Sequence, residues 1–166
     1  MAFVETVNDF RDNLLNFGFP EITQNYATRD CILYALGIGF GEAPTHRAEL
    51  PFVFEVPRLK VVPSLAAVLA SPGFWARDTA TGIDWHRFLH AEQEVVLHRR
   101  LPSNATVRAK TRITRIIDKG EANGALIYLE RDISDQLGAL ATVKVVNFAR
   151  GNGGCGGDTG HQPKPH

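Results

Sequence analysis

Strand-like patterns fill the second half of the chain. Four segments alternate apolar and polar positions, and short turns containing Asp, Lys or Gly separate the last three. Alternation with a period of two is typical of strands that bury one face. We therefore predict strands at 91–101, 106–117, 125–133 and 140–149. Turns as short as 118–121 and 135–138 require antiparallel neighbours, so we expect a four-stranded meander.

Helical spacing dominates the first half. Apolar positions predict an amphipathic helix over 7–17, ended by Gly18 and Pro20. A second helix is expected from Thr28 as N-cap to Gly37, followed by a loop at 39–46 whose path Pro44 fixes. The buried stripe of this second helix is predicted to comprise Cys31, Ile32, Leu33 and Leu36. Residues 52–56 are β-branched and aromatic and lie between two prolines, which predicts a short edge strand.

The segment 63–70 is apolar on nearly every side. A helix of this kind is normally buried all round, typically against a sheet that wraps it. One buried helix followed by an antiparallel meander is the element order of an α+β hot-dog fold, with a generic α+β roll as the alternative. We expect one domain over 1–150, with an N-terminal arm or helix at 1–25 and a mobile glycine-rich tail or linker at 151–166.

Composition and charge exclude several classes of protein. The 166 residues carry 18 basic and 18 acidic side chains, so no net charge attracts nucleic acid. No apolar run reaches the ~20 residues that span a bilayer, and residues 1–10 lack a secretory signal, so we expect neither a membrane span nor secretion. Cys31 and Cys155 lie far apart and predict neither a disulfide nor a metal site, which favours a reducing compartment.

Candidate chemistry concentrates at the head of the first strand of the meander. His90 is followed closely by Glu92, Gln93 and Glu94, although a solvated strand end is the simpler interpretation. No zinc-ligand spacing, nucleophile elbow or Cys–His pair is present in the sequence. The basic positions 108, 110 and 112 predict a solvated sheet face, because no aromatic residues interleave with them. The glycine run at 151–157 opens no helix and therefore predicts a linker rather than a phosphate loop.

Several blocks of the sequence resemble one family. Residues 82–93, 101–102, 118–120 and 147–157, together with 26–39, are similar in order to the N-terminal half of the type 2, or MaoC-like, enoyl-CoA hydratases. The resemblance implies a hot-dog fold and the hydration of trans-2-enoyl-CoA to (R)-3-hydroxyacyl-CoA, a hydro-lyase reaction. It implies no cofactor beyond the CoA of the substrate. It also implies a cytoplasmic location in a bacterium or a peroxisomal one in a eukaryote.

The resemblance also implies site residues. His90 and Ala91 would contact the thioester ligand and Lys119 the CoA moiety, and Ala91 replaces the family's usual glycine, which narrows that contact. The family's catalytic Asp-x-Asn-Pro-x-His motif is absent from this sequence. We therefore assign no catalytic residue and expect an acyl-CoA-binding half that needs a catalytic hot-dog partner chain or a C-terminal half, since the chain stops where the second repeat is expected.

Two alternatives remain open. A hot-dog acyl-CoA thioesterase would use Glu92 or Asp84 as its base. A non-catalytic acyl-CoA-binding or scaffold subunit would turn over nothing. In every case we expect an acyl-CoA thioester ligand and a homo- or hetero-dimeric hot-dog partner.

Overall fold

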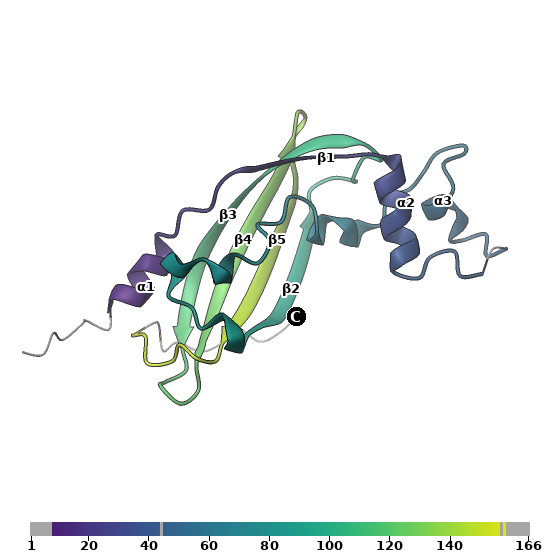
Figure 1. Ribbon diagram of the computed structural model, residues 1–166. Coiled ribbons are helices and arrows are strands. Elements are labelled where there is room, and N and C mark those ends of the chain that lie inside the picture. The colour runs from purple at the N-terminus through teal and green to yellow at the C-terminus, as the bar shows by residue number, and fades with distance from the viewer. Residues whose placement is uncertain (1–7, 44, 157, 159–166) are drawn as a thin grey trace, which may run out of the picture.

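One antiparallel sheet organises the protein. The computed structural model describes residues 8–43, 45–156 and 158. Its five strands lie in the order β1-β3-β4-β5-β2, so β1 and β2 form the two edges (Figure 1). The strands are β1 (Ile22–Tyr26), β2 (Phe88–Leu97), β3 (Ala105–Asp118), β4 (Ala125–Asp135) and β5 (Gly138–Ala149).

The four strands expected in the second half are confirmed, but the expected meander is wrong in one connection. β2 pairs with β5 rather than with β3, from Phe88↔Ala149 to Leu97↔Ala141. The connection at 98–104 therefore crosses three strand spacings, about 14 Å. Seven extended residues reach about 23 Å, so the loop is long enough not to force a hairpin. β2 consequently becomes an edge strand.

The other edge strand, β1, was not predicted and lies in the segment expected to be an arm. It pairs with β3 from Ile22↔Ala109 to Tyr26↔Ala105. Three of its five residues are exposed, so its sequence lacks the apolar alternation that marks a strand with one covered face. Tyr26 is buried and its hydroxyl donates to the Pro102 carbonyl at 2.9 Å, which ties β1 to the loop between β2 and β3.

The segment at 63–70 is a short 3₁₀ helix, η1 (Pro63–Ala67), followed by a turn. Leu65 and Leu69 are buried and pack with Val107, Ile133 and Val143 of the sheet. Val68 is 52% exposed, so the expectation of a helix buried on every side is wrong. The segment covers the sheet with one side only, and its other side, which includes Val68, faces solvent.

The region between β1 and η1 differs most from expectation. Helix α2 (Thr28–Gly37) begins with Ala27 rather than Thr28 as N-cap, and the Asp30 carboxylate accepts the Ala27 N–H at 2.9 Å. The buried stripe of α2 is narrower than predicted, because Leu33 and Leu36 are exposed. The side chains of α2 that are buried are Cys31 and Ala35.

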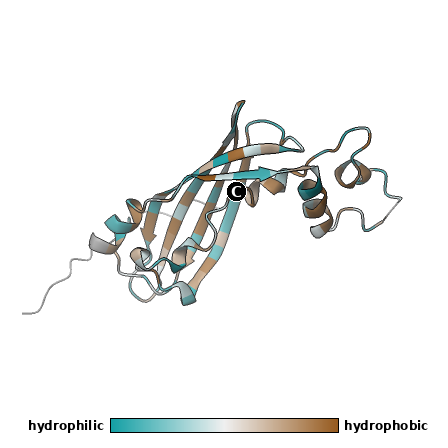
Figure 2. Ribbon diagram, turned by 45° about the horizontal axis from the view of Figure 1, so that its top comes forward, coloured by the Kyte–Doolittle hydropathy of each residue, from teal (hydrophilic) through white to brown (hydrophobic). Residues whose placement is uncertain are grey.

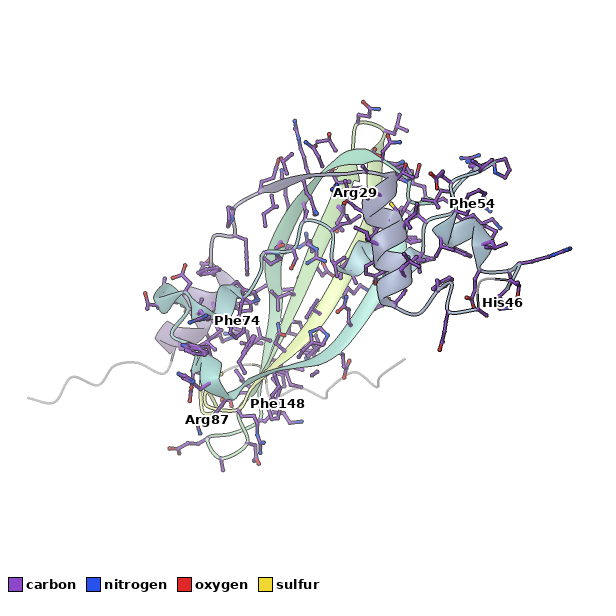
Figure 3. The ribbon with its side chains drawn as sticks, turned by 45° about the vertical axis from the view of Figure 1, so that its right-hand side comes forward. Arg29, His46, Phe54, Phe74, Arg87 and Phe148 are labelled. Atoms are coloured by element: carbon purple, nitrogen blue, oxygen red, sulfur yellow. The ribbon has the colours of Figure 1, made fainter. Side chains whose placement is uncertain are left out.

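Residues 52–56 do not form the predicted strand. Helix α3 (Leu50–Val53) overlaps the start of this segment, and Pro51 lies in its first turn, where the missing N–H costs no hydrogen bond. Phe52 packs against Phe40 with ring centroids 5.0 Å apart. Figure 1 shows α2 and α3 beyond one end of the sheet, and Figure 3 places Phe54 and His46 there. The described residues of the predicted loop, 39–43 and 45–46, form neither helix nor strand, and Pro44 lies outside the described residues.

The opposite end of the sheet is covered by helix α1 (Asn8–Leu15), which confirms the first predicted helix, and by three short 3₁₀ helices, η2 (Trp75–Arg77), η3 (Thr79–Thr81) and η4 (Trp85–Arg87). Leu14 of α1 is fully buried in a cluster with Ile113 and Ile116 of β3.

The described part of the glycine-rich segment also packs at that end. The backbone N–H groups of Gly154 and Gly156 each donate to the Asp118 carboxylate at 2.9 Å, and Cys155 is buried. Residues 151–156 and 158 therefore pack against the sheet instead of leading away from it as a linker would, and the rest of the predicted tail, 157 and 159–166, lies outside the described residues.

The two faces of the sheet differ in character. Brown and teal bands alternate along the long strands in Figure 2, as expected for strands with one covered face. On the outer face, exposed Arg112 pairs with Glu130 and Asp132, each at 2.5 Å, and Lys110 pairs with Glu21 at 3.4 Å. This face is the solvated one that the basic alternation predicts. The inner face carries the core and the candidate site.

Candidate functional site

A cavity of about 260 Å³ lies on the inner face, between the sheet and the segment that follows η1. Phe74, Trp75 and Phe88 form an aromatic wall, in which the Trp75 and Phe88 rings meet edge-to-face with centroids 5.6 Å apart. The polar lining residues are Ser71, His90, Gln93, Thr111, Arg131 and Asn147. An apolar wall with a few convergent polar groups is the usual composition of a small-molecule site.

A β-bulge determines which side chains of β2 enter this cavity. His90 pairs with Asn147 and Glu92 pairs with Val146, so Ala91 is the extra residue. In a regular strand, positions 90 and 93 would lie on opposite faces. The bulge shifts the alternation by one residue, and both His90 and Gln93 line the cavity. The simple period-two pattern of the sequence could not have placed them together.

The exposure of the cavity lining decreases across the sheet, from the edge strand β2 to the central strands. His90 and Gln93, on the edge strand β2, are exposed. Asn147 and Arg131, on the central strands β5 and β4, are each only 6% exposed. The cavity therefore has a solvent-facing mouth at β2 and a buried floor that contains a guanidinium group.

The floor residue Arg131 was not identified from the sequence. It lies on the inner face of β4, opposite Thr111 of β3 and Val143 of β5. Its Nη2 donates to the carbonyls of Ala66 at 3.4 Å and Ala67 at 2.6 Å, at the end of η1. Burial lowers the pKa of this guanidinium. The signal in the sequence was a basic residue at an apolar position of the alternation, between Leu129 and Ile133.

The predicted binding residues are only partly brought together. His90 lines the cavity, and Ala91 is the exposed bulge residue beside it and does not line the described cavity. The Ala91 methyl group therefore does not narrow that cavity. Lys119 lies in the exposed turn after β3, three strands across the sheet from β2, at the end where β2 begins. The roles assigned to these three residues remain predictions.

Neither carboxylate of the thioesterase alternative lines the cavity. Glu92 pairs with Val146, which packs with Tyr128 in a separate cluster, and the charge of Glu92 raises the pKa of Tyr128 after the larger effect of burial. Asp84 instead accepts from Arg87 Nε at 2.7 Å, and this hydrogen bond lowers its pKa. Neither carboxylate is therefore placed as a base for a ligand in the described cavity.

Asp84 and Arg87 hold the head of β2 in place. The Asp84 N–H donates to Asn152 Oδ1 at 3.0 Å, and the Arg150 N–H donates to the Arg87 carbonyl at 3.0 Å. Figure 3 labels Arg87 and Phe148 toward this end of the sheet, and Phe74 on the segment that lines the cavity opposite the sheet. The glycine-rich segment thus helps to position the strand that carries His90.

Within the described ranges, no three His, Cys, Asp or Glu side chains gather as a metal site would require. The described helices include none that is both long enough and apolar enough to cross a bilayer.

Known proteins of similar sequence and structure share this architecture. Enoyl-CoA hydratase ChsH3 of Mycobacterium tuberculosis is 34% identical over 154 residues, which cover 90% of this chain and 53% of that protein. The chain spans about half the length of the curated relatives it matches. The crystal structure of a MaoC-like dehydratase from Phytophthora capsici superposes with a TM-score of 0.71 at 26% identity, over 94% of this chain and 54% of that one.

A more distant structure shares the fold alone. The ChsH1-ChsH2 complex from Mycobacterium tuberculosis matches with a TM-score of 0.63 at 11% identity, over 92% of this chain and 97% of that chain. With the five-stranded antiparallel sheet, these structural matches confirm the hot-dog fold. The family model for the MFE-2 hydratase 2 N-terminal domain matches residues 24–151, and the chain belongs to that family.

Proposed function

We propose that this chain is the acyl-CoA-binding half of an (R)-specific 2-enoyl-CoA hydratase and that a second hot-dog domain supplies the catalytic groups. The observation that carries the proposal is the inner-face cavity, with His90 at its mouth and no Asp or Glu among the described residues that line it. Hydration of an enoyl thioester needs a group that activates water and a group that protonates the α-carbon. One histidine without a carboxylate does not provide the Asp–His pair of the family's motif, which is also absent from the sequence.

The edge position of β2 supports a partner. An edge strand leaves a row of backbone N–H and C=O groups facing outward, ready to pair with another strand. His90 and Gln93 lie on this strand, so a domain that docks along β2 would bring its side chains to the cavity mouth. The matched ChsH1-ChsH2 structure is a complex of two chains, which is consistent with this arrangement.

The test is an assay of hydration with crotonyl-CoA. Titration calorimetry should show that the chain alone binds the thioester. Its hydration rate should nevertheless be lower, by a factor of ~10² or more, than that of the same chain mixed with a catalytic hot-dog domain that carries Asp-x-Asn-Pro-x-His. Matched samples of the catalytic domain alone serve as the control. Efficient turnover by the chain alone would overturn its assignment as the non-catalytic half, and absence of any thioester binding would overturn the proposal as a whole.

The second candidate is a purely binding subunit. It shares the cavity but predicts that no catalytic hot-dog domain produces turnover above that domain's own rate. The mixing experiment therefore separates the two candidates directly.

A further inference from the structure

The floor of the cavity holds a positive charge that lacks a full set of partners. Arg131 is only 6% exposed, and its Nε has no hydrogen-bond partner among the described residues. Its other described contacts are with two neutral carbonyls, of Ala66 and Ala67. A buried charge normally has a carboxylate partner, because an unpaired ion in an apolar surrounding is costly.

Among the described residues, no carboxylate side chain is placed against the guanidinium. No Asp or Glu is among the described lining residues of the cavity. The acidic neighbours of Arg131 along β4, Glu130 and Asp132, pair with Arg112 on the outer face. The cavity floor therefore favours a ligand with a negative charge.

We propose that this cavity binds acyl groups that end in a carboxylate, with Arg131 as the residue that receives it. The inference rests on the proposed function for the thioester end of the ligand and adds the chemistry of the other end. A guanidinium suits this role because it donates in a planar fork to carboxylate oxygens. In the absence of a ligand, the carbonyls of Ala66 and Ala67 hold it in place.

The dimensions of the cavity favour a short chain. His90 lies level with Asn147 on β5, and Arg131 lies level with Val143 on the same strand. Four residues of strand separate these levels, about 13 Å, and two strand spacings, about 10 Å, separate β2 from β4. The two backbone positions therefore lie about 16 Å apart, and the His90 and Arg131 side chains, which both line the cavity, shorten the span that a ligand must bridge. The volume of about 260 Å³ is roughly that of nine water molecules in the liquid. A thioester at the mouth and a carboxylate at the floor therefore fit an acyl chain of a few carbons.

The experiment compares two six-carbon thioesters that differ in the terminal group. Hexanoyl-CoA ends in a methyl group and adipoyl-CoA in a carboxylate, so the charges of the CoA moiety cancel in the comparison. Titration calorimetry with the unmodified chain should show adipoyl-CoA binding about 10-fold or more tightly, the scale of one charge-assisted hydrogen bond. Arg131→Met should abolish this preference and Arg131→Lys should retain part of it.

The matched control is Arg108→Met. Arg108 is an exposed arginine of the neighbouring strand β3, outside this cavity, so its variant should keep the full preference for adipoyl-CoA. Equal or tighter binding of hexanoyl-CoA by the unmodified chain would overturn the inference without touching the proposed function. This comparison needs no variant and holds even if Arg131→Met fails to fold.

A second measurement separates the inference from the proposed function. Free adipate and free hexanamide, a neutral compound with the same number of carbons, are added to the chain in a thermal unfolding experiment. If neither CoA ester binds but adipate alone raises the midpoint, and Arg131→Met removes this effect, the carboxylate site stands and the proposed function fails. If adipate and hexanamide act alike and neither CoA ester is preferred, the carboxylate site is excluded.

Discussion

Asp118, the last residue of β3, accepts the backbone N–H of Gly154 at 2.9 Å although 36 residues separate the two in sequence. The same carboxylate accepts from Gly156 at 2.9 Å and from Gly120 at 2.8 Å. One side chain therefore joins the β3–β4 turn to the segment that follows β5. Because that segment also contacts Asp84 through Asn152, the carboxylate helps to fix the end of the sheet where β2 begins.

Replacing this carboxylate should destabilise the fold. Asp118→Asn retains one acceptor oxygen but directs an NH₂ group at backbone donors, so we expect a loss of about 1 kcal/mol in the free energy of unfolding. This is below the usual range for hydrogen bonds to charged groups because the side chain is partly solvated. Urea unfolding at pH 7 measures it, with Asp12→Asn on the exposed side of α1 as the matched control.

The pH dependence of this difference has a definite sign. Burial alone would raise the pKa of Asp118, but hydrogen bonds from the backbone N–H groups, that of Gly120 first, outweigh it and the pKa is lowered. A carboxyl whose folded pKa lies below its unfolded value of ~3.9 stabilises the fold above that value and ceases to do so as pH falls through the folded pKa. The difference between Asp118→Asn and the unmodified chain should therefore shrink below about pH 4. A difference of the same size at pH 3 and pH 7 would contradict this account.

The glycines of the same segment should be needed for close packing. A Cβ added at Gly153 would lie 2.2 Å from the Gly120 carbonyl oxygen and 2.7 Å from the Gly124 nitrogen, both backbone atoms. We expect Gly153→Ala to cost about 2–3 kcal/mol, the scale of overpacking. At Gly18 nothing lies within 4 Å of the added Cβ, so Gly18→Ala should be neutral or slightly stabilising. Thermal unfolding of the two variants tests the contrast, and equal midpoints would refute it.

Sequence pattern predicted the local elements better than their arrangement. The alternation in β3, β4 and β5 reflects one buried face, which is a local property, and these strands are confirmed. The pairing of β2 with β5 depends on a loop that crosses the end of the sheet, and β1 is an edge strand with mostly exposed residues, so neither left a periodic signal. The glycine run was misread because its composition matches that of a linker, whereas here glycine is needed for the close approach of two backbones.

The candidate site could be predicted only in part. The resemblance implies His90 as a ligand contact, and His90 does line the cavity. Gln93 lines the same cavity only because of the β-bulge at Ala91, which the sequence pattern does not predict. Arg131 was hidden because it lies in the third segment of the pattern, far in sequence from the head of β2. The role that we propose for Arg131 depends on η1 lying across the sheet, which is a long-range contact.

Lys119 provides a test of the predicted CoA contact. If its ammonium group meets the CoA phosphates, Lys119→Ala should weaken acyl-CoA binding more at low salt than at high salt, since exposed charges are screened within ~10 Å at 0.1 M. The affinity of both proteins is measured by titration calorimetry at ~20 mM and ~300 mM NaCl. Lys110→Ala, an exposed lysine on the outer face of β3, serves as the control. An effect of Lys119→Ala that stays constant with salt would indicate packing rather than charge.

Of the two predicted thioester contacts, His90 and Ala91, His90 is the one that lines the cavity. Its imidazole can donate or accept a hydrogen bond, and it lies at the exposed mouth of the cavity, opposite Asn147. We expect His90→Ala to weaken acyl-CoA binding by about 1–2 kcal/mol, the scale of one polar contact, and to leave the unfolding midpoint nearly unchanged because the side chain is exposed.

A matched histidine makes the His90 measurement specific. His98, just beyond the other end of β2, is exposed, hydrogen-bonds Thr142 Oγ1 at 3.0 Å and lies outside this cavity. His98→Ala should therefore leave acyl-CoA affinity unchanged. The loss at His90 should be the same for hexanoyl-CoA and adipoyl-CoA, because both present the same thioester to the mouth, whereas a loss at Arg131 should affect adipoyl-CoA alone. Equal affinity of His90→Ala and the unmodified chain for both ligands would remove His90 from the site.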